Sequence, residues 1–248
     1  MDNKKLIFAF LLGMVMIFFI VNNLIWLSQD TLPPAWDQAH HMSLSLKYYR
    51  FMSEAKSVRD INSLFSISHY YPPFFHISAV PIILVSGFSE HNLTFVNLFY
   101  LFLFSVCMFK IGKILFNERV GLMSTLLTLF YPIMYAMSRQ YLIDFALVAM
   151  ITAVQYLILK SEGGLKKPWN VLLGIVSGFT LLTKPVSIIF FFPVWVFVFA
   201  MNFQKRKDFV SFFIVVVVSL LIASPWYFSA LPDLLRMNNY WQNIAMTV

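Results

Sequence analysis

The chain has 248 residues, of which 60% are hydrophobic and only 12% are charged, and its mean hydropathy is +0.75. Long stretches of this apolarity are not stable in water, which excludes a soluble domain and indicates a polytopic α-helical membrane protein. We attribute the formal net charge of +7 to cytoplasmic loops rather than to nucleic-acid binding. The single cysteine, Cys107, excludes an intrachain disulfide and argues against a thiolate metal site.

Seven apolar segments are predicted to cross the membrane, giving an all-α transmembrane bundle. They are residues 6–27, 92–112, 119–136, 143–160, 169–183, 185–203 and 209–228. All but the fifth have roughly the 17–25 residues that a bilayer crossing needs. The first is predicted to be an uncleaved signal anchor. The apolar stretch 73–88 is too short to cross and predicts an interfacial or re-entrant helix.

The basic residues determine the predicted orientation. With a cytoplasmic N-terminus, the inner loops hold eleven basic residues: Lys4, Lys5, Lys110, Lys113, Arg119, Lys160, Lys166, Lys167, Lys205, Arg206 and Lys207. Their acids are Asp2, Glu118, Glu162 and Asp208, so the inner face carries 11 − 4 = +7. The other seven basic and seven acidic residues lie outside and cancel, as the positive-inside rule requires. Residues 28–91 then form a long extracytoplasmic loop within one membrane domain of residues 1–248.

This loop begins with the most informative acid of the chain, Asp37. It starts an amphipathic stretch, residues 36–55, which predicts a helix lying along the membrane surface. Asp37 is either the N-cap of that helix or a general base that accepts the proton of an attacking hydroxyl. His40 and His41 follow on the same helical face. Asp-x-x-His-His offers metal ligands, although paired surface histidines without a metal are far commoner.

Three further outer-face motifs carry candidate residues. In Ser68-His69-Tyr70-Tyr71-Pro72-Pro73, the tyrosines and histidine either anchor at the interface or line a polar pocket. Asp144 lies at the start of a span and needs a partner, for which Arg139 is the candidate, in a structural or a catalytic pair. Lys184 separates two apolar runs, where it either snorkels to the interface or binds a lipid phosphate.

The order of these motifs resembles that of the GT-C glycosyltransferases. An acid follows the first span, and then come Tyr71-Pro72-Pro73-Phe74, Ser138-Arg139 with Asp144, Leu182-Thr183-Lys184-Pro185, and Pro225-Trp226-Tyr227. The most similar group contains the protein O-mannosyltransferases, the lipid A aminoarabinose transferases and related bacterial polyprenyl-phosphate-sugar transferases. Members normally continue with further spans, so this chain is expected to be a C-terminally truncated member.

The resemblance implies an integral membrane enzyme that moves a sugar from a polyprenyl-phosphate donor to a lipid, glycan or protein acceptor outside the cytoplasm, with inversion. Asp37 matches the catalytic base. Lys184 and Arg139 are the candidates for binding the lipid phosphate. The other expected substrate-binding residues are Asp144, Tyr71, His69 and His40. No metal site and no certain cofactor is expected, although a divalent cation assists parts of this superfamily.

Two other classes remain open from the sequence: a transporter or flippase for a lipid-linked solute, and an inactive truncated membrane scaffold. A transporter needs polar groups at mid-membrane depth. The predicted spans carry few, among them Asn97 and Gln155. The clustering of charge on one face also argues against a path across the membrane.

Overall fold

The computed structural model describes residues 3–54, 61–206 and 209–245. The loop charges at positions 2, 56, 59, 60, 207 and 208 lie outside the described residues. Within the described ranges the helices are α1 (Asn3–Gln29), α2 (Trp36–Glu54), α3 (Ile61–Leu64), α4 (Phe74–Ser78), α5 (Val80–Ser86), α6 (Glu90–Thr94), α7 (Val96–Leu115), α8 (Glu118–Leu129), α9 (Pro132–Met137), α10 (Ile143–Lys160), α11 (Lys167–Leu181), α12 (Ser187–Arg206) and α13 (Phe209–Ala245). The predicted all-α class is confirmed.

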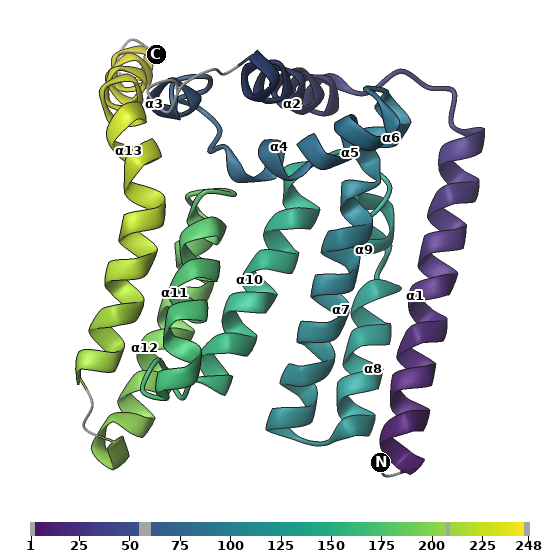
Figure 1. The fold of residues 1–248 in the computed structure, drawn as a ribbon, viewed down its shortest axis with the longest axis vertical. Helices are drawn as coiled ribbons and strands as arrows, with labels where there is room; N and C mark the ends of the chain where they lie inside the picture. Colours follow the sequence, from purple (N-terminus) through teal and green to yellow (C-terminus); the bar gives the residue numbers. More distant parts are fainter. Residues whose placement is uncertain (1–2, 55–60, 207–208, 246–248) are drawn as a thin grey trace.

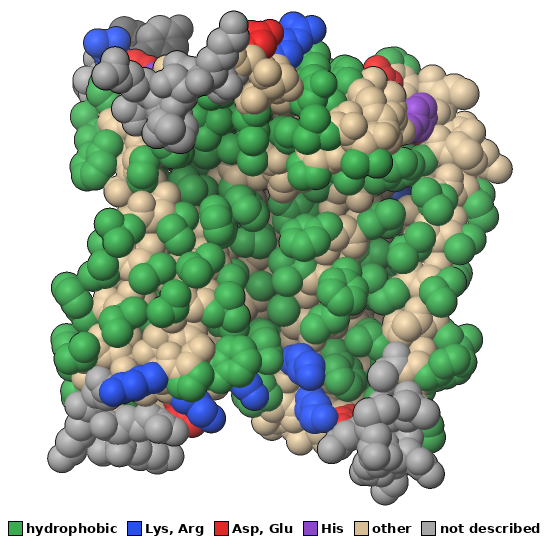
Figure 2. Space-filling view, in the orientation of Figure 1, with side chains coloured by type: hydrophobic (Ala, Val, Ile, Leu, Met, Phe, Trp, Pro, Cys, Tyr) green, Lys and Arg blue, Asp and Glu red, His purple; other side chains and the backbone are tan. Residues whose placement is uncertain are grey.

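The helices form a bundle with a cap across one end. In Figure 1, α1, α7, α8, α10, α11, α12 and α13 run along the long axis, whereas α2 to α6 lie across the top. Hydrophobic side chains cover the middle of the molecule in Figure 2, and charged side chains lie near both ends. Large apolar side chains such as Phe10, Leu127 and Leu221 are exposed on the flanks, as expected for a surface in contact with lipid tails.

Four helical stretches of the described chain are long and apolar enough to cross a membrane. They are Phe10–Gln29, Glu90–Leu115, Ile143–Lys160 and Phe209–Asp233. The predicted span 119–136 is not one continuous helix, because α8 ends at Leu129 and Pro132 begins α9. Proline cannot continue the hydrogen-bond pattern of a helix and holds the preceding Tyr131 extended. The last predicted span, 209–228, continues as α13 to Ala245.

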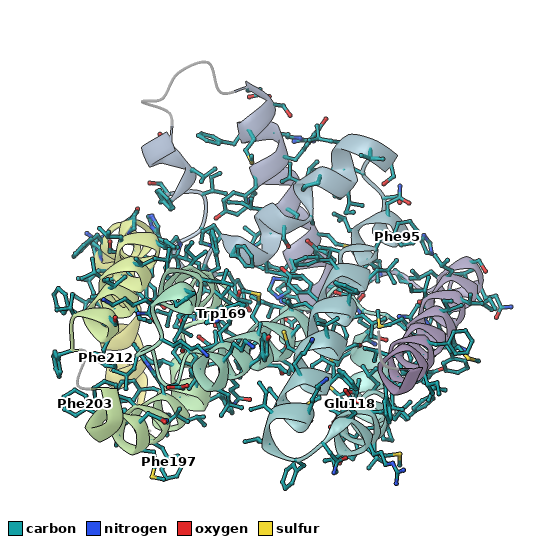
Figure 3. All side chains as sticks on the ribbon, turned by 60° about the horizontal axis from the view of Figure 1, so that its bottom comes forward. Phe95, Glu118, Trp169, Phe197, Phe203 and Phe212 are labelled. Atoms are coloured by element: carbon teal, nitrogen blue, oxygen red, sulfur yellow. The ribbon has the colours of Figure 1, made fainter. Side chains whose placement is uncertain are left out.

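The two ends of the bundle differ in charge. The turns from α7 to α8 and from α10 to α11 lie at the end opposite the cap (Figure 1), and they contain Lys113, Arg119, Lys160 and Lys166. Basic side chains gather at this end in Figure 2. Figure 3, turned toward it, shows Glu118 and Trp169 at the first turns of α8 and α11. The cap therefore lies opposite the loops that the positive-inside rule assigns to the cytoplasm.

Two glycines bring α11 close to α13. A Cβ atom added to Gly174 would lie 2.7 Å from Cβ of Val218, and one added to Gly178 would lie 2.8 Å from Cβ of Ile222. Small residues four apart let helix backbones approach closely within a membrane. The same helix, α13, also contacts the cap. Its Trp226 is fully buried and donates its Nε1–H to the carbonyl oxygen of Ser68 at 2.8 Å.

Gly178→Ala is expected to lower the thermal unfolding midpoint, because the new methyl group forces α11 and α13 apart at a cost of about 1–3 kcal/mol. Gly13→Ala is the matched control, since its added Cβ meets nothing within 4 Å. Both variants gain about 1 kcal/mol of helix propensity, so their difference isolates the packing clash. Equal midpoints for the two variants, measured in one lipid environment, would contradict this helix contact.

Candidate active site

An ion pair joins two of the predicted site residues. Lys184 Nζ lies 2.9 Å from Asp144 Oδ1, and both side chains are partly exposed. Asp144 occupies the first turn of α10, where the helix dipole favours a negative charge. Lys184 occupies the short turn between α11 and α12. The partner of Asp144 is therefore Lys184 and not Arg139, which corrects the pairing expected from the sequence.

Arg139 is held by the first span instead. Its Nε donates to Oδ1 of Asn23 at 3.1 Å, and its Nη2 donates to Oδ1 of Asn22. The guanidinium carbon lies 3.8 Å from the ring centroid of Tyr135 and 5.1 Å from that of Trp26. Because α9 ends just before Arg139, the side chain reaches α1. Sequence reasoning missed the two asparagines, although adjacent amides inside an apolar span are a signal for a polar partner.

Asp37 lies in the first turn of α2, which begins at Trp36. The N-cap position therefore falls on Ala35, and the N-cap interpretation of Asp37 is wrong. Burial first, and then the charges of Tyr70, Asp37 and Asp144, raise the pKa of the Tyr71 hydroxyl. Two acids from different helices thus act on the same phenol.

Tyr71 lies between α2 and the turn that carries Lys184. Its ring centroid lies 4.7 Å from that of His41 and 5.6 Å from that of His40, both on α2. Three residues later, the Phe74 N–H donates to the carbonyl oxygen of Leu182 at 3.0 Å. This bond fixes the Pro72-Pro73 turn against the turn that carries Lys184. We call Asp37, His40, Tyr71, Asp144 and Lys184 the cap cluster. In it His40 contacts the Tyr71 ring, Lys184 pairs with Asp144, and the charges of Asp37 and Asp144 both raise the pKa of Tyr71.

A buried pair of histidines joins α2 to α4 within the cap. His41 Nδ1 lies 3.0 Å from His76 Nε2, and His76 Nδ1 lies 3.3 Å from the carbonyl oxygen of Pro72. A carbonyl oxygen only accepts, so His76 carries its proton on Nδ1 and His41 donates from Nδ1 to His76 Nε2. Burial lowers the pKa of His41 to about 4 and that of His76 to about 3. Both rings are therefore neutral at pH 7.

This pair predicts an acid-labile cap. The pKa of each folded histidine lies below its unfolded value of 6.5, so the unfolded state binds more protons as the pH falls. The free energy of unfolding is expected to be constant well above pH 6.5 and to fall by several kcal/mol as the pH drops from 6.5 to about 3. Denaturation of wild type and a His76→Phe variant across this range measures the effect. Parallel pH profiles for the two proteins would contradict it.

His69 binds the last helix rather than the cap cluster. Its Nδ1 hydrogen-bonds to Oδ2 of Asp233, and its Nε2 lies 3.3 Å from Oγ of Ser229. Together with the bond from Trp226 to Ser68, this ties the segment before Tyr71 to α13. Sequence reasoning missed Asp233. The signal was an acid at the outer end of an apolar run, where a buried or half-buried charge needs a partner.

The site also tests the metal interpretation of Asp37, His40 and His41. In the part of the chain that the structure describes, no group of three or more His, Cys, Asp or Glu side chains could hold a metal ion. The ring centroids of His40 and His41 are 6.1 Å apart, and His41 bonds to His76. The two histidine side chains therefore contact aromatic and histidine rings.

The fold and the site define a polytopic α-helical membrane protein with paired ionic and aromatic groups in a cap across one end of the helical bundle. Residues 71–228 match the family model of the dolichyl-phosphate-mannose-protein mannosyltransferases. The chain belongs to this family and is a membrane glycosyltransferase of the GT-C type. The matched range contains Tyr71, Arg139, Asp144 and Lys184, whereas Asp37 precedes it. Neither the search of curated proteins nor that of solved structures found a match.

Proposed function

We propose that the chain transfers a sugar from a polyprenyl-phosphate donor to an acceptor at the extracytoplasmic membrane surface, with inversion at the anomeric carbon. The observation that carries the proposal is the convergence of an acid, a phenol and a lysine–aspartate pair in the cap cluster. Helix α2, which carries Asp37 and His40, and the first turn of α10, which carries Asp144, lie at the end opposite the basic loops (Figure 1). The positive-inside rule assigns that end to the outside.

In the proposed reaction, the Asp37 carboxylate accepts the proton of the acceptor hydroxyl as its oxygen attacks the anomeric carbon. A new C–O bond forms on one face of the sugar. The bond to the phosphate oxygen breaks on the other face, and the electron pair leaves with the polyprenyl phosphate. One displacement of this kind inverts the anomeric configuration. Asp37 is exposed, so a hydroxyl that enters from the membrane surface can reach it.

Lys184 stabilises the charge of the leaving phosphate in this scheme. Asp144 holds the ammonium group in place through the 2.9 Å contact, and an oriented cation needs no reorganisation as charge develops. The raised pKa of Tyr71 keeps its hydroxyl protonated at neutral pH, so it donates a hydrogen bond to phosphate or sugar. His40 packs beside the Tyr71 ring and restricts its orientation. His69 fixes the loop that carries Tyr71.

An apolar groove beside Lys184 supports a lipid-linked donor. Leu181 and Pro185, on either side of Lys184 in the chain, line a cavity of about 410 Å³ together with Leu220, Tyr227 and Phe228. The groove therefore extends from the α11–α12 turn along α13, on a face where Leu220 and Phe228 are exposed. A polyprenyl chain in this groove would leave its phosphate at Lys184, where a cation meets the edge of the apolar surface.

The polar groups inside the spans favour an enzyme over a transporter. Asn97 Nδ2 donates to the carbonyl oxygen of Gln140 at 2.7 Å, and Gln155 Nε2 lies 3.4 Å from that of Phe190. Both amides thus bond to backbone carbonyls of neighbouring segments rather than lining a path. A transporter requires a binding site near mid-membrane depth, whereas the cap cluster lies at one end.

Reconstitution into sealed vesicles distinguishes a transferase from a transporter. Purified protein is reconstituted with a radiolabelled polyprenyl-phosphate sugar, and the label is followed by phase partition and by accessibility to a membrane-impermeant glycosidase. We expect the label to leave the lipid, with the anomeric configuration of the product opposite to that of the donor. Label that changes membrane side while still attached to its lipid would instead indicate a flippase.

A further inference from the structure

A second cavity, with both polar and apolar walls, lies beside α2. It has a volume of about 270 Å³ and lies between the end of α1, the loop of residues 30–35, α2, α6 and the α9–α10 turn. Its lining includes Trp26, Asp30, Gln38, Glu90, His91 and Arg139. This volume lies just below the range of about 300–1,000 Å³ that is common for ligand pockets, so the cavity has room for no more than one small ligand. It contrasts with the groove beside Lys184, whose walls are almost entirely apolar.

The walls of this cavity carry hydrogen-bonding groups that the protein does not use. Within the described residues, the Glu90 carboxylate and the Gln38 side-chain amide have no hydrogen-bond partner. Arg139 uses Nε and one Nη on the asparagines of α1, which leaves further N–H groups of its five. His91 Nε2 lies 3.1 Å from the carbonyl oxygen of Asp30, so in its neutral form its Nδ1 is an acceptor. Donors and acceptors therefore line the same small space.

The cavity and Asp37 lie on adjacent faces of the first turns of α2. Gln38 and Met42, four residues apart, face the cavity. Asp37 and His41, also four apart, face the cap cluster, where both act together with Tyr71. Because Asp37 and Gln38 are consecutive, their Cα atoms are about 3.8 Å apart, so the proposed base lies on the residue next to one that lines the cavity.

We propose that this cavity binds the sugar of a glycan acceptor and presents one of its hydroxyls to Asp37. Each hydroxyl of a sugar both donates and accepts, which matches a wall that mixes Arg139 and Gln38 with Glu90 and His91. The half-exposed Trp26 offers an apolar face for the C–H groups of the ring. A phosphate would be repelled by Glu90 and Asp30, and an extended peptide would need a longer groove. The assignment rests on the proposed transferase function and names its acceptor class.

Binding of simple glycosides tests the assignment without requiring turnover. The full chain is placed in lipid nanodiscs free of alkyl-glycoside detergents, which would themselves compete for a sugar site. Methyl glycosides of mannose, glucose and N-acetylglucosamine are titrated by saturation-transfer NMR, beside a serine- and threonine-rich peptide. We expect saturable binding of at least one glycoside. Gln38→Ala and Glu90→Gln should each weaken it on the order of tenfold, because each removes a hydrogen bond to the ligand.

Glu54→Gln is the matched control for Glu90→Gln, since Glu54 is exposed at the far end of α2 and should leave glycoside affinity unchanged. The proposal is overturned if no glycoside binds, if Gln38→Ala and Glu90→Gln bind like wild type, or if only the peptide binds. If glycosides do not bind and the wild type still consumes the radiolabelled donor, the acceptor assignment fails and the transferase function stands. A wild-type protein that does not consume the radiolabelled donor would instead contradict the proposed transferase function, on which the acceptor assignment rests.

Discussion

Replacing Asp37 by Asn is expected to abolish sugar transfer while the protein remains folded. The amide keeps the size of the carboxylate but cannot accept the proton of the acceptor hydroxyl, and general-base catalysis contributes about 10²–10⁴-fold to a rate. Asp37 is exposed in the first turn of α2 and forms no ion pair within the described residues, so its loss leaves no buried charge behind. Initial rates with a radiolabelled donor, beside thermal unfolding of the same preparation, measure both effects.

Glu54→Gln is again the matched control, because it removes one carboxylate from the other end of the same helix. We expect its transfer rate to equal that of the wild type. An Asp37→Asn variant with a wild-type rate would remove Asp37 from the mechanism. A variant that loses activity and unfolding midpoint together would assign Asp37 a role in folding of the cap instead.

Lys184→Gln is expected to slow transfer by about 10²–10³-fold, because the leaving phosphate loses the cation that stabilises it. The effect on stability should be small: both side chains of the Asp144–Lys184 pair are partly exposed, and such pairs contribute about 0–1 kcal/mol. A large loss of rate with a small change in unfolding midpoint therefore distinguishes a phosphate-binding lysine from a structural ion pair.

Lys184→Arg is the conservative variant for this test. It keeps the positive charge and should recover part of the rate, although the geometry of a guanidinium differs from that of an ammonium group. Equal rates for wild type and Lys184→Gln would contradict the phosphate assignment. A fall in unfolding midpoint without a fall in rate would show that the lysine only snorkels to the interface and pairs with Asp144.

Much of the fold follows from the sequence because its signal is local. Long apolar runs need about 20 residues to cross a membrane, and the stretches Phe10–Gln29 and Ile143–Lys160 correspond to predicted spans. The break at Pro132 is also local and could have been predicted from the restriction that proline places on Tyr131. It was missed because hydropathy averages over a window and does not register a single helix-breaking residue.

The candidate site was less accessible to sequence reasoning, because its contacts join segments far apart in the chain. Tyr71 and Lys184 were both proposed from motif order. Asp144 pairs with Lys184 because Arg139, just after the end of α9, is bonded to the asparagines of α1. This arrangement depends on how α1 and α9 pack together. The buried pair of His41 and His76 forms only because α2 packs against α4. No spacing rule gives these contacts, since they are set by packing between elements.

The most direct test of the account is whether purified wild-type protein releases the sugar of a radiolabelled polyprenyl-phosphate donor in lipid nanodiscs, and whether the Asp37→Asn variant does not. The proposed mechanism predicts that label passes from the lipid phase to acceptor or water with the wild type, and stays on the lipid with the variant. Label that stays on the lipid with both proteins, or leaves it at the same rate with both, would contradict the assignment of Asp37 and the cap cluster as the catalytic centre.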